Sequence, residues 1–200
     1  MKLQTVGPFE VLDQRVTYRL YCNGNTDEFK EIFYRALTRV LGFSKRHALG
    51  IFNPIEFIED VYLFSQKSEF DENLISKGWP IEKLIPLTYV GLGQAKSIFL
   101  VSLPAYQKIF PENSEKDYEN IIVHELAHLL HVAFLKGNEA LMGPPYIYEG
   151  FACFVAEQYL EEPLPSMDEV RSLCEDSSLS YPRMAAIFRK ITEKIFAHFQ

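Results

Sequence analysis

The sequence predicts an α+β fold, in which a small mixed sheet packs against one central helix and a mostly helical part follows. In the first half of the chain, short segments rich in β-branched and aromatic residues favour two or three strands. From residue 105 onward, apolar residues recur only with helical spacing. Strands followed by helices are typical of α+β layering around one core. We therefore expect a single domain over residues 1–200, mixed up to residue 104 and helical from residue 105.

Composition excludes several classes of protein. Apolar residues make up 48% of the chain and aromatic residues 14%, which indicates a folded chain. The formal net charge of −7 argues against binding to nucleic acid or to an anionic membrane. No apolar run is long enough to suggest a membrane span or a secretory signal. The three cysteines, Cys22, Cys153 and Cys174, form no CxxC pair, so we expect a reducing compartment and a cytoplasmic protein.

The first half of the chain offers helices and strands in alternation. Phe29, Phe33 and Leu37 recur at helical spacing behind a cap at Asn25 or Thr26. The predicted elements are a helix at 25–41, a strand at 60–64, a helix from a Ser65 cap to a Gly78 stop, and a strand at 97–103. Gly91 and Gly93 indicate a turn or bulge beside this last strand, whose edge is expected to admit a peptide backbone.

The second half begins with the most informative helix. Ser114 and Asp117 form a capping pair ahead of it, and Gly137 is its natural terminator. A turn-rich loop leads to a second apolar helix at 146–160, and the segment EEPLPS is a linker. Beyond it we expect a short helix opened by Ser166 and Glu169 and a long one at 181–199.

The motif HELAH at 124–128 has the HExxH pattern. Residues four apart on a helix lie side by side, so His124 and His128 can share one tetrahedral metal. Glu125 lies on the neighbouring edge of the same face, where a carboxylate can reach a metal-bound water without ligating the metal.

The apolar flanks of HELAH predict that this helix is buried. Each unpartnered imidazole or carboxylate in such a helix would cost about 1–3 kcal/mol. A metal ion with a bound water would satisfy all three groups at once. The alternative is a polar core cluster, in which the histidines bond to carboxylates or carbonyls.

Zinc needs a third protein ligand, and the absence of HExxHxxGxxH excludes the metzincin arrangement. Glu149 is the better candidate, because the 20 residues between it and His128 allow a helix, a turn at the prolines and a second helix. By itself, Glu149 would be an ordinary acidic residue near a helix start, where the helix dipole favours it. The preceding HELAH and the following Gly150 instead favour a role for Glu149 as a metal ligand.

HELAH followed by EGFA resembles the gluzincin metallopeptidases, a group that includes the aminopeptidase N enzymes, thermolysin and smaller peptidase MA-like domains. The resemblance covers roughly residues 55–195 and implies a minimal thermolysin-like catalytic domain with one zinc ion per chain. It implies His124, His128 and Glu149 as the zinc ligands. The segment YPRMAAIFRKI is similar to a family segment in which a tyrosine, here Tyr181, donates a hydrogen bond to the tetrahedral intermediate.

The resemblance implies zinc-dependent peptide-bond hydrolysis with Glu125 as general base and a peptide or protein as substrate, extended along the strand at 97–103. The family's GxMEN segment, which binds a free amino terminus, is missing, and GLGQA stands in a comparable place. We therefore expect an endo- or oligopeptidase. The alternatives are a catalytically inactive binding module with a structural or vestigial zinc site, and a domain without zinc in which the HELAH helix is simply core. The sequence leaves the oligomeric state open.

Five residues have weaker assignments. His131 could orient a ligand or a substrate, or be a satisfied core histidine. Glu157 could accept a hydrogen bond from a ligand histidine, or be a solvated helix position. Tyr181 could instead pack locally at a helix start. His47 and His198 carry no pattern and are expected at the surface.

Overall fold

A five-stranded sheet is the centre of the fold in the computed structural model, which describes residues 1–12, 14–24, 26–47, 57–79, 90–94, 96–176 and 178–197. The strand order is β1-β2-β3-β5-β4. The strands are β1 (Lys2–Val11), β2 (Gln14–Cys22), β3 (Asp60–Phe64), β4 (Gly91–Gln94) and β5 (Ser97–Val101). The outer pairs β1/β2 and β4/β5 are antiparallel, whereas β2, β3 and β5 run parallel, so the sheet is mixed as predicted.

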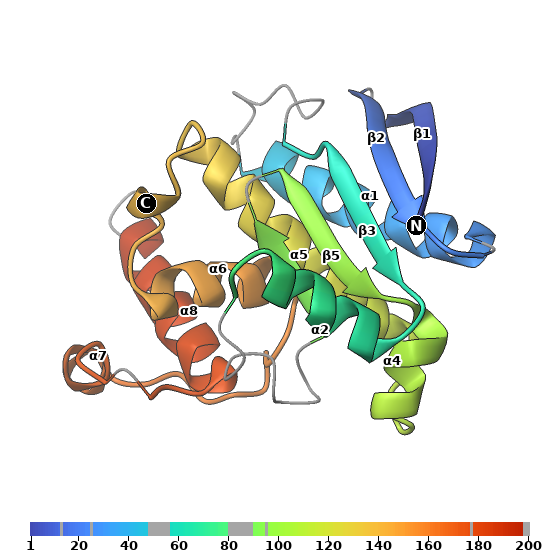
Figure 1. The fold of residues 1–200 in the computed structure, drawn as a ribbon. Helices are drawn as coiled ribbons and strands as arrows, with labels where there is room; N and C mark the ends of the chain where they lie inside the picture. Colours follow the sequence, from blue (N-terminus) through green and yellow to red (C-terminus); the bar gives the residue numbers. More distant parts are fainter. Residues whose placement is uncertain are drawn as a thin grey trace.

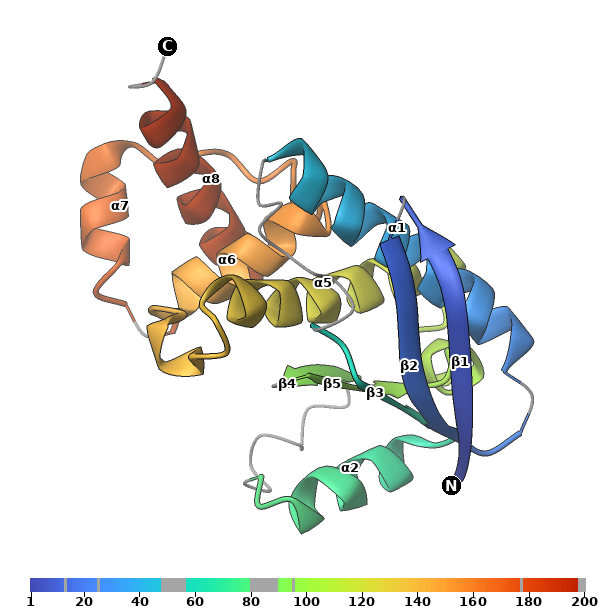
Figure 2. The same ribbon diagram turned by 90° about the horizontal axis from the view of Figure 1, so that it is seen from above.

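Helices cover both faces of this sheet (Figures 1 and 2). Helices α1 (Asp27–Arg46) and α5 (Glu115–Phe134) lie on one face, and α2 (Lys67–Ser76) lies on the other. Short helix α4 (Leu103–Ile109) follows β5 directly. The predicted α+β class is therefore confirmed for the described residues.

The two faces of the sheet follow from the alternation of side chains along each strand. Leu20, Val61 and Ile98 are fully buried neighbours on the face toward α1 and α5. On the opposite face, the rings of Tyr21, Tyr62 and Phe99 stack in register across three strands, with 4.6 Å between the centroids of neighbouring rings.

Helix α5 has the start that the sequence predicts. The Ser114 side chain accepts the backbone N–H of Asp117, and the Asp117 carboxylate accepts the backbone N–H of Ser114. The Tyr118 hydroxyl donates to the Val101 carbonyl across 2.6 Å, which joins the helix to β5. These contacts fix α5 against the central part of the sheet.

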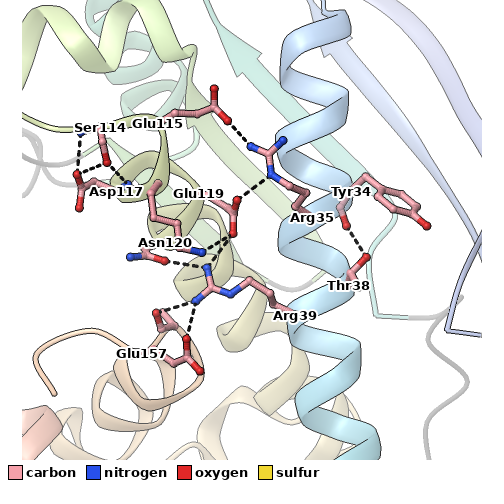
Figure 3. A network of polar contacts seen from close by, with 12 residues as sticks. Tyr34, Arg35, Thr38, Arg39, Ser114, Glu115, Asp117, Glu119, Asn120 and Glu157 are labelled. Carbon is pink, nitrogen blue, oxygen red and sulfur yellow. Dashed lines mark hydrogen bonds and ion pairs between the residues drawn. The ribbon is translucent and has the colours of Figure 1, made fainter.

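An ion-pair network joins α5 to α1 (Figure 3). The Glu119 side chain is only 6% exposed and accepts hydrogen bonds from Arg35 (2.9 Å), Arg39 (3.0 Å) and Lys116 (2.8 Å). Burial alone would raise the pKa of Glu119, but the hydrogen bonds from Lys116, Arg35 and Arg39 outweigh it and lower this pKa to about 2. The carboxylate therefore stays charged within the fold.

The remaining helices gather beyond the C-terminal half of α5 (Figure 2). They are the 3-10 helix η2 (Glu139–Leu141), α6 (Pro145–Val155), α7 (Met167–Leu173) and α8 (Tyr181–Ala197). The Ser166–Glu169 capping box at the start of α7 is confirmed. No helix in the part of the chain that the structure describes is long and apolar enough to cross a bilayer.

The structure corrects several predicted elements. The strand predicted at 97–103 is not an edge strand, because β4 pairs with its outer side. Gly91 and Gly93 therefore lie within an edge strand and do not form a turn. The α2 helix begins after Gln66 without a Ser65 side-chain cap, whereas Gly78, at φ +87°, does follow its end.

Strands β1 and β2 and helix α4 were not predicted. Asn25 and His198 lie outside the described residues, and His47 is exposed, as predicted.

Candidate metal centre

Two buried histidines project from one face of α5. His124 is 7% exposed and His128 is 9% exposed, and the two Nε2 atoms lie 3.2 Å apart. Because residues four apart lie on one helix face, the helix alone brings the two nitrogens together. The neighbouring apolar residues, including Val123, Leu126 and Ala127, are fully buried and hold this part of α5 in the core.

Glu149 completes a three-residue cluster from the first half of α6. Its Oε2 lies 3.1 Å from His124 Nε2 and 3.3 Å from His128 Nε2. The three atoms lie within 4.8 Å of one another, so they could hold a metal ion. Two imidazole nitrogens and one carboxylate oxygen are a donor set that suits zinc and leaves a coordination position open.

The position of Glu149 depends on how α6 packs. Pro145 begins α6, where its missing N–H costs no helical hydrogen bond. Gly150 then permits close contact with α8, because a Cβ there would lie 2.5 Å from Phe188 Cβ and 2.8 Å from the Met184 carbonyl. The residue after Glu149 therefore has a packing reason to be glycine, apart from any family pattern.

The protonation of the cluster reflects the proximity of its members. Burial alone would raise the pKa of Glu149, but hydrogen bonds from His124 and His128 lower this pKa to about 2. Burial alone would lower the pKa of His124, but bonds to Cys153 and Glu149 raise this pKa well above its ordinary value. A metal ion bound by the cluster would take the place of a ring proton.

Glu125 lies on the edge of the same helix, next to strand β4. Its Oε2 accepts the backbone N–H of Gly93 across 2.7 Å. A Cβ at Gly93 would lie 2.5 Å from the Glu125 carbonyl oxygen, and one at Gly91 would lie 3.0 Å from the Glu125 side chain. The two glycines therefore allow β4 to approach α5 at the position of Glu125. Burial raises the pKa of Glu125, against the effect of the two nearby histidines.

The predicted residues Glu125, Tyr181 and the His–His–Glu cluster line one cavity of about 540 Å³. Tyr181 is the first residue of α8, and its ring centroid lies 5.9 Å from that of His124. Its side chain is 43% exposed, so the ring stands at the rim of the cavity. The other lining residues are Trp79, Leu92, Gly93, Gln94, Val132, Glu139, Met142, Gly143 and Tyr148.

Of the two alternatives for Glu157, the hydrogen bond that it would accept from His124 or His128 is not formed. Glu157 is exposed and pairs with Arg39 at 3.5 Å. The next residue, Gln158, has its Oε1 2.9 Å from His124 Nδ1. The sequence predicted a helix over 146–160 that includes Glu157, but α6 ends at Val155 and Glu157 has φ +56°. No sequence pattern indicated this turn, because such a conformation favours glycine or asparagine.

His131 does not line the cavity. Its ring packs 5.0 Å from the ring of Phe151, between centroids. Its Nδ1 is buried without a hydrogen-bond partner among the described residues, so it is not a satisfied core histidine either. Burial lowers the pKa of His131, with a contribution from the nearby His128.

Comparison of the chain with protein-family models gives no match, and neither the curated proteins nor the solved structures give one.

Proposed function

We propose that this protein is a zinc-dependent metallohydrolase of the gluzincin type, with a minimal thermolysin-like catalytic domain that hydrolyses peptide bonds. The observation that supports this best is the convergence of His124 Nε2, His128 Nε2 and Glu149 Oε2 within 4.8 Å of one another, with Glu125 lining the same cavity. This donor set fits zinc, because three protein ligands leave one position for a water or a substrate.

Zinc bound by these three residues would lower the pKa of a water toward about 7 and polarise a substrate carbonyl. Glu125 accepts the proton of the attacking water and passes it to the leaving amine. The Gly93 N–H holds one carboxylate oxygen of Glu125, which leaves Oε1 for this transfer. The Tyr181 hydroxyl, at the rim, donates a hydrogen bond to the developing oxyanion.

The peptide substrate extends along β4, since this strand, and not β5, is the edge of the sheet beside the cavity. The GLGQA segment carries no glutamate to bind a free amino terminus. We therefore favour endopeptidase or oligopeptidase activity at this edge strand over the removal of single amino-terminal residues.

The metal content of the purified protein tests this function. We expect one zinc ion per chain by elemental analysis, and a sharp loss of zinc in Glu149→Ala. Glu139→Ala is the matched control, because Glu139 lines the same cavity without belonging to the ligand cluster and its loss should leave the zinc content unchanged. A protein that takes up no added zinc would exclude the proposal. If the protein binds zinc but hydrolyses no peptide in a broad library, the alternative of a catalytically inactive binding module would be favoured.

A further inference from the structure

A histidine that ligates through Nε2 must carry its ring proton on Nδ1. The Nε2 of His124 faces His128 and Glu149, so its Nδ1 faces away from the cluster. A buried N–H without an acceptor costs about 1–3 kcal/mol. The site therefore needs a hydrogen-bond acceptor behind His124.

Two groups lie near this nitrogen. Gln158 Oε1 is 2.9 Å from His124 Nδ1, which is an ordinary hydrogen-bond length. Cys153 Sγ is 3.8 Å away, and a thiol sulfur is a weak acceptor. The amide carbonyl of Gln158 is thus the effective acceptor.

The end of α6 holds Gln158 in this position. Glu157 takes a left-handed conformation, its N–H donates to the Phe154 carbonyl at 3.2 Å, and the N–H of Gln158 donates to the Cys153 carbonyl at 2.9 Å. These two bonds form a Schellman motif that turns the chain back along the helix. Arg39 adds a hydrogen bond of 3.1 Å to the Ala156 carbonyl, and the side chains of Glu119 and Asn120 hold Arg39 in turn (Figure 3).

We propose that Gln158 is a positioning residue of the metal centre: its side-chain carbonyl accepts the Nδ1–H of His124 and so holds the ring with Nε2 directed at the metal. The inference rests on the proposed zinc site. Helix α6 then contributes to the centre twice, with the ligand Glu149 near its start and the partner of a second ligand just past its end. Gln158 provides the hydrogen bond without the negative charge that a carboxylate in this position would add.

The zinc dissociation constant, measured by competition with a chelator, tests this role. Gln158→Leu should weaken zinc binding by about 10–100-fold. Gln158→Asn keeps the amide but is one methylene shorter, so it should also weaken binding, whereas Gln158→Glu should bind zinc at least as tightly as the wild type. Glu157→Gln is the matched control on the adjacent, exposed residue, and it should stay within about twofold of the wild type.

A second readout is independent of affinity. In the zinc-loaded wild type, the Nδ1–H proton of His124 should give a slowly exchanging imidazole signal in the NMR spectrum. This signal should be retained in Gln158→Glu and lost by exchange in Gln158→Asn and Gln158→Leu.

The outcomes separate this proposal from the proposed function. Wild-type affinity in Gln158→Leu and Gln158→Asn would overturn the role of Gln158 alone, as would a Gln158→Glu variant that binds zinc more weakly than Gln158→Asn. If Gln158→Leu fails to fold, the Asn and Glu variants still decide the question. A wild-type protein that binds no zinc would overturn the metal site itself.

Discussion

Replacement of Glu125 is expected to separate metal binding from hydrolysis in the proposed mechanism. In Glu125→Gln the side chain keeps its shape and can still accept the Gly93 N–H, but it can no longer take a proton from water. We expect turnover of a peptide substrate to fall by about 10²–10⁴-fold, which is the range for loss of a general base. Zinc content should be unchanged. Hydrolysis at the wild-type rate would contradict the mechanism.

Tyr181 contributes a hydroxyl at the rim of the same cavity. Tyr181→Phe keeps the ring beside His124 and removes only the hydrogen-bond donor. If the hydroxyl stabilises the oxyanion, kcat should fall by about 10²–10³-fold with little change in KM. Equal kcat values for Tyr181→Phe and the wild type would show that Tyr181 only packs at the start of α8.

Between elements, helices α6 and α8 make a close contact near the site at Gly150. Gly150→Ala would place a methyl group 2.5 Å from Phe188 Cβ, so the two helices must separate. We expect a loss of about 1–3 kcal/mol in the free energy of unfolding, measured by urea denaturation. Gly42→Ala in α1 is the control, because the added Cβ would contact only Leu12, at 3.6 Å. This substitution should stabilise the helix by about 0.5–1 kcal/mol. A neutral Gly150→Ala would refute this account of the contact.

The ion-pair network between α1 and α5 makes a pH-dependent contribution to the free energy of unfolding. The pKa of Glu119 is about 2 in the folded chain, below its ordinary value of 4.5. Its contribution to stability is therefore complete above pH 4.5 and is lost as the pH falls toward 2. Glu119→Gln should lower the free energy of unfolding at pH 7 by about 2 kcal/mol.

Urea denaturation of Glu119→Gln and the wild type, between pH 7 and pH 3, tests this contribution. The difference between the two proteins should shrink in acid. Glu157→Gln removes only the exposed pair with Arg39, so its effect should stay below about 1 kcal/mol at every pH. A difference that does not depend on pH would contradict the assignment to Glu119.

Sequence periodicity predicted two helices that carry the site, because α8 has a clear apolar stripe, and α5 has apolar flanks around HELAH and a capping box. It missed β1, in which Gly7 and Pro8 interrupt the strand pattern and the pairing register with β2 shifts between Val6 and Phe9. Proline is tolerated there because β1 is an edge strand. The spacing of the sequence indicated the His–His–Glu cluster. It could not indicate Gln158, because the position of Gln158 depends on where α6 ends, and packing decides where that is.

At the scale of the whole molecule, zinc would join α5 to α6. A ligand at about 1,000 times its Kd stabilises the native state by about 4 kcal/mol, which for a chain of this size raises Tm by roughly 8–16 °C. We expect that shift in a calorimetric comparison of zinc-loaded and chelator-treated protein. Glu149→Ala should show little or none of it. An equal shift in Glu149→Ala would mean that zinc binds elsewhere.

The order of strands in the sheet also implies an order of assembly. Strands β1 and β2 are neighbours in the chain and can pair early, whereas the parallel partners β3 and β5 must close long loops. The proposed metal ligands belong to elements that follow all five strands in the chain. A folding intermediate with a finished sheet would present His124 and His128 before α6 brings Glu149 into place. Tight zinc capture would then be one of the last steps of folding, and scarcity of zinc would leave the sheet formed and the C-terminal helices as the part of the chain open to proteases.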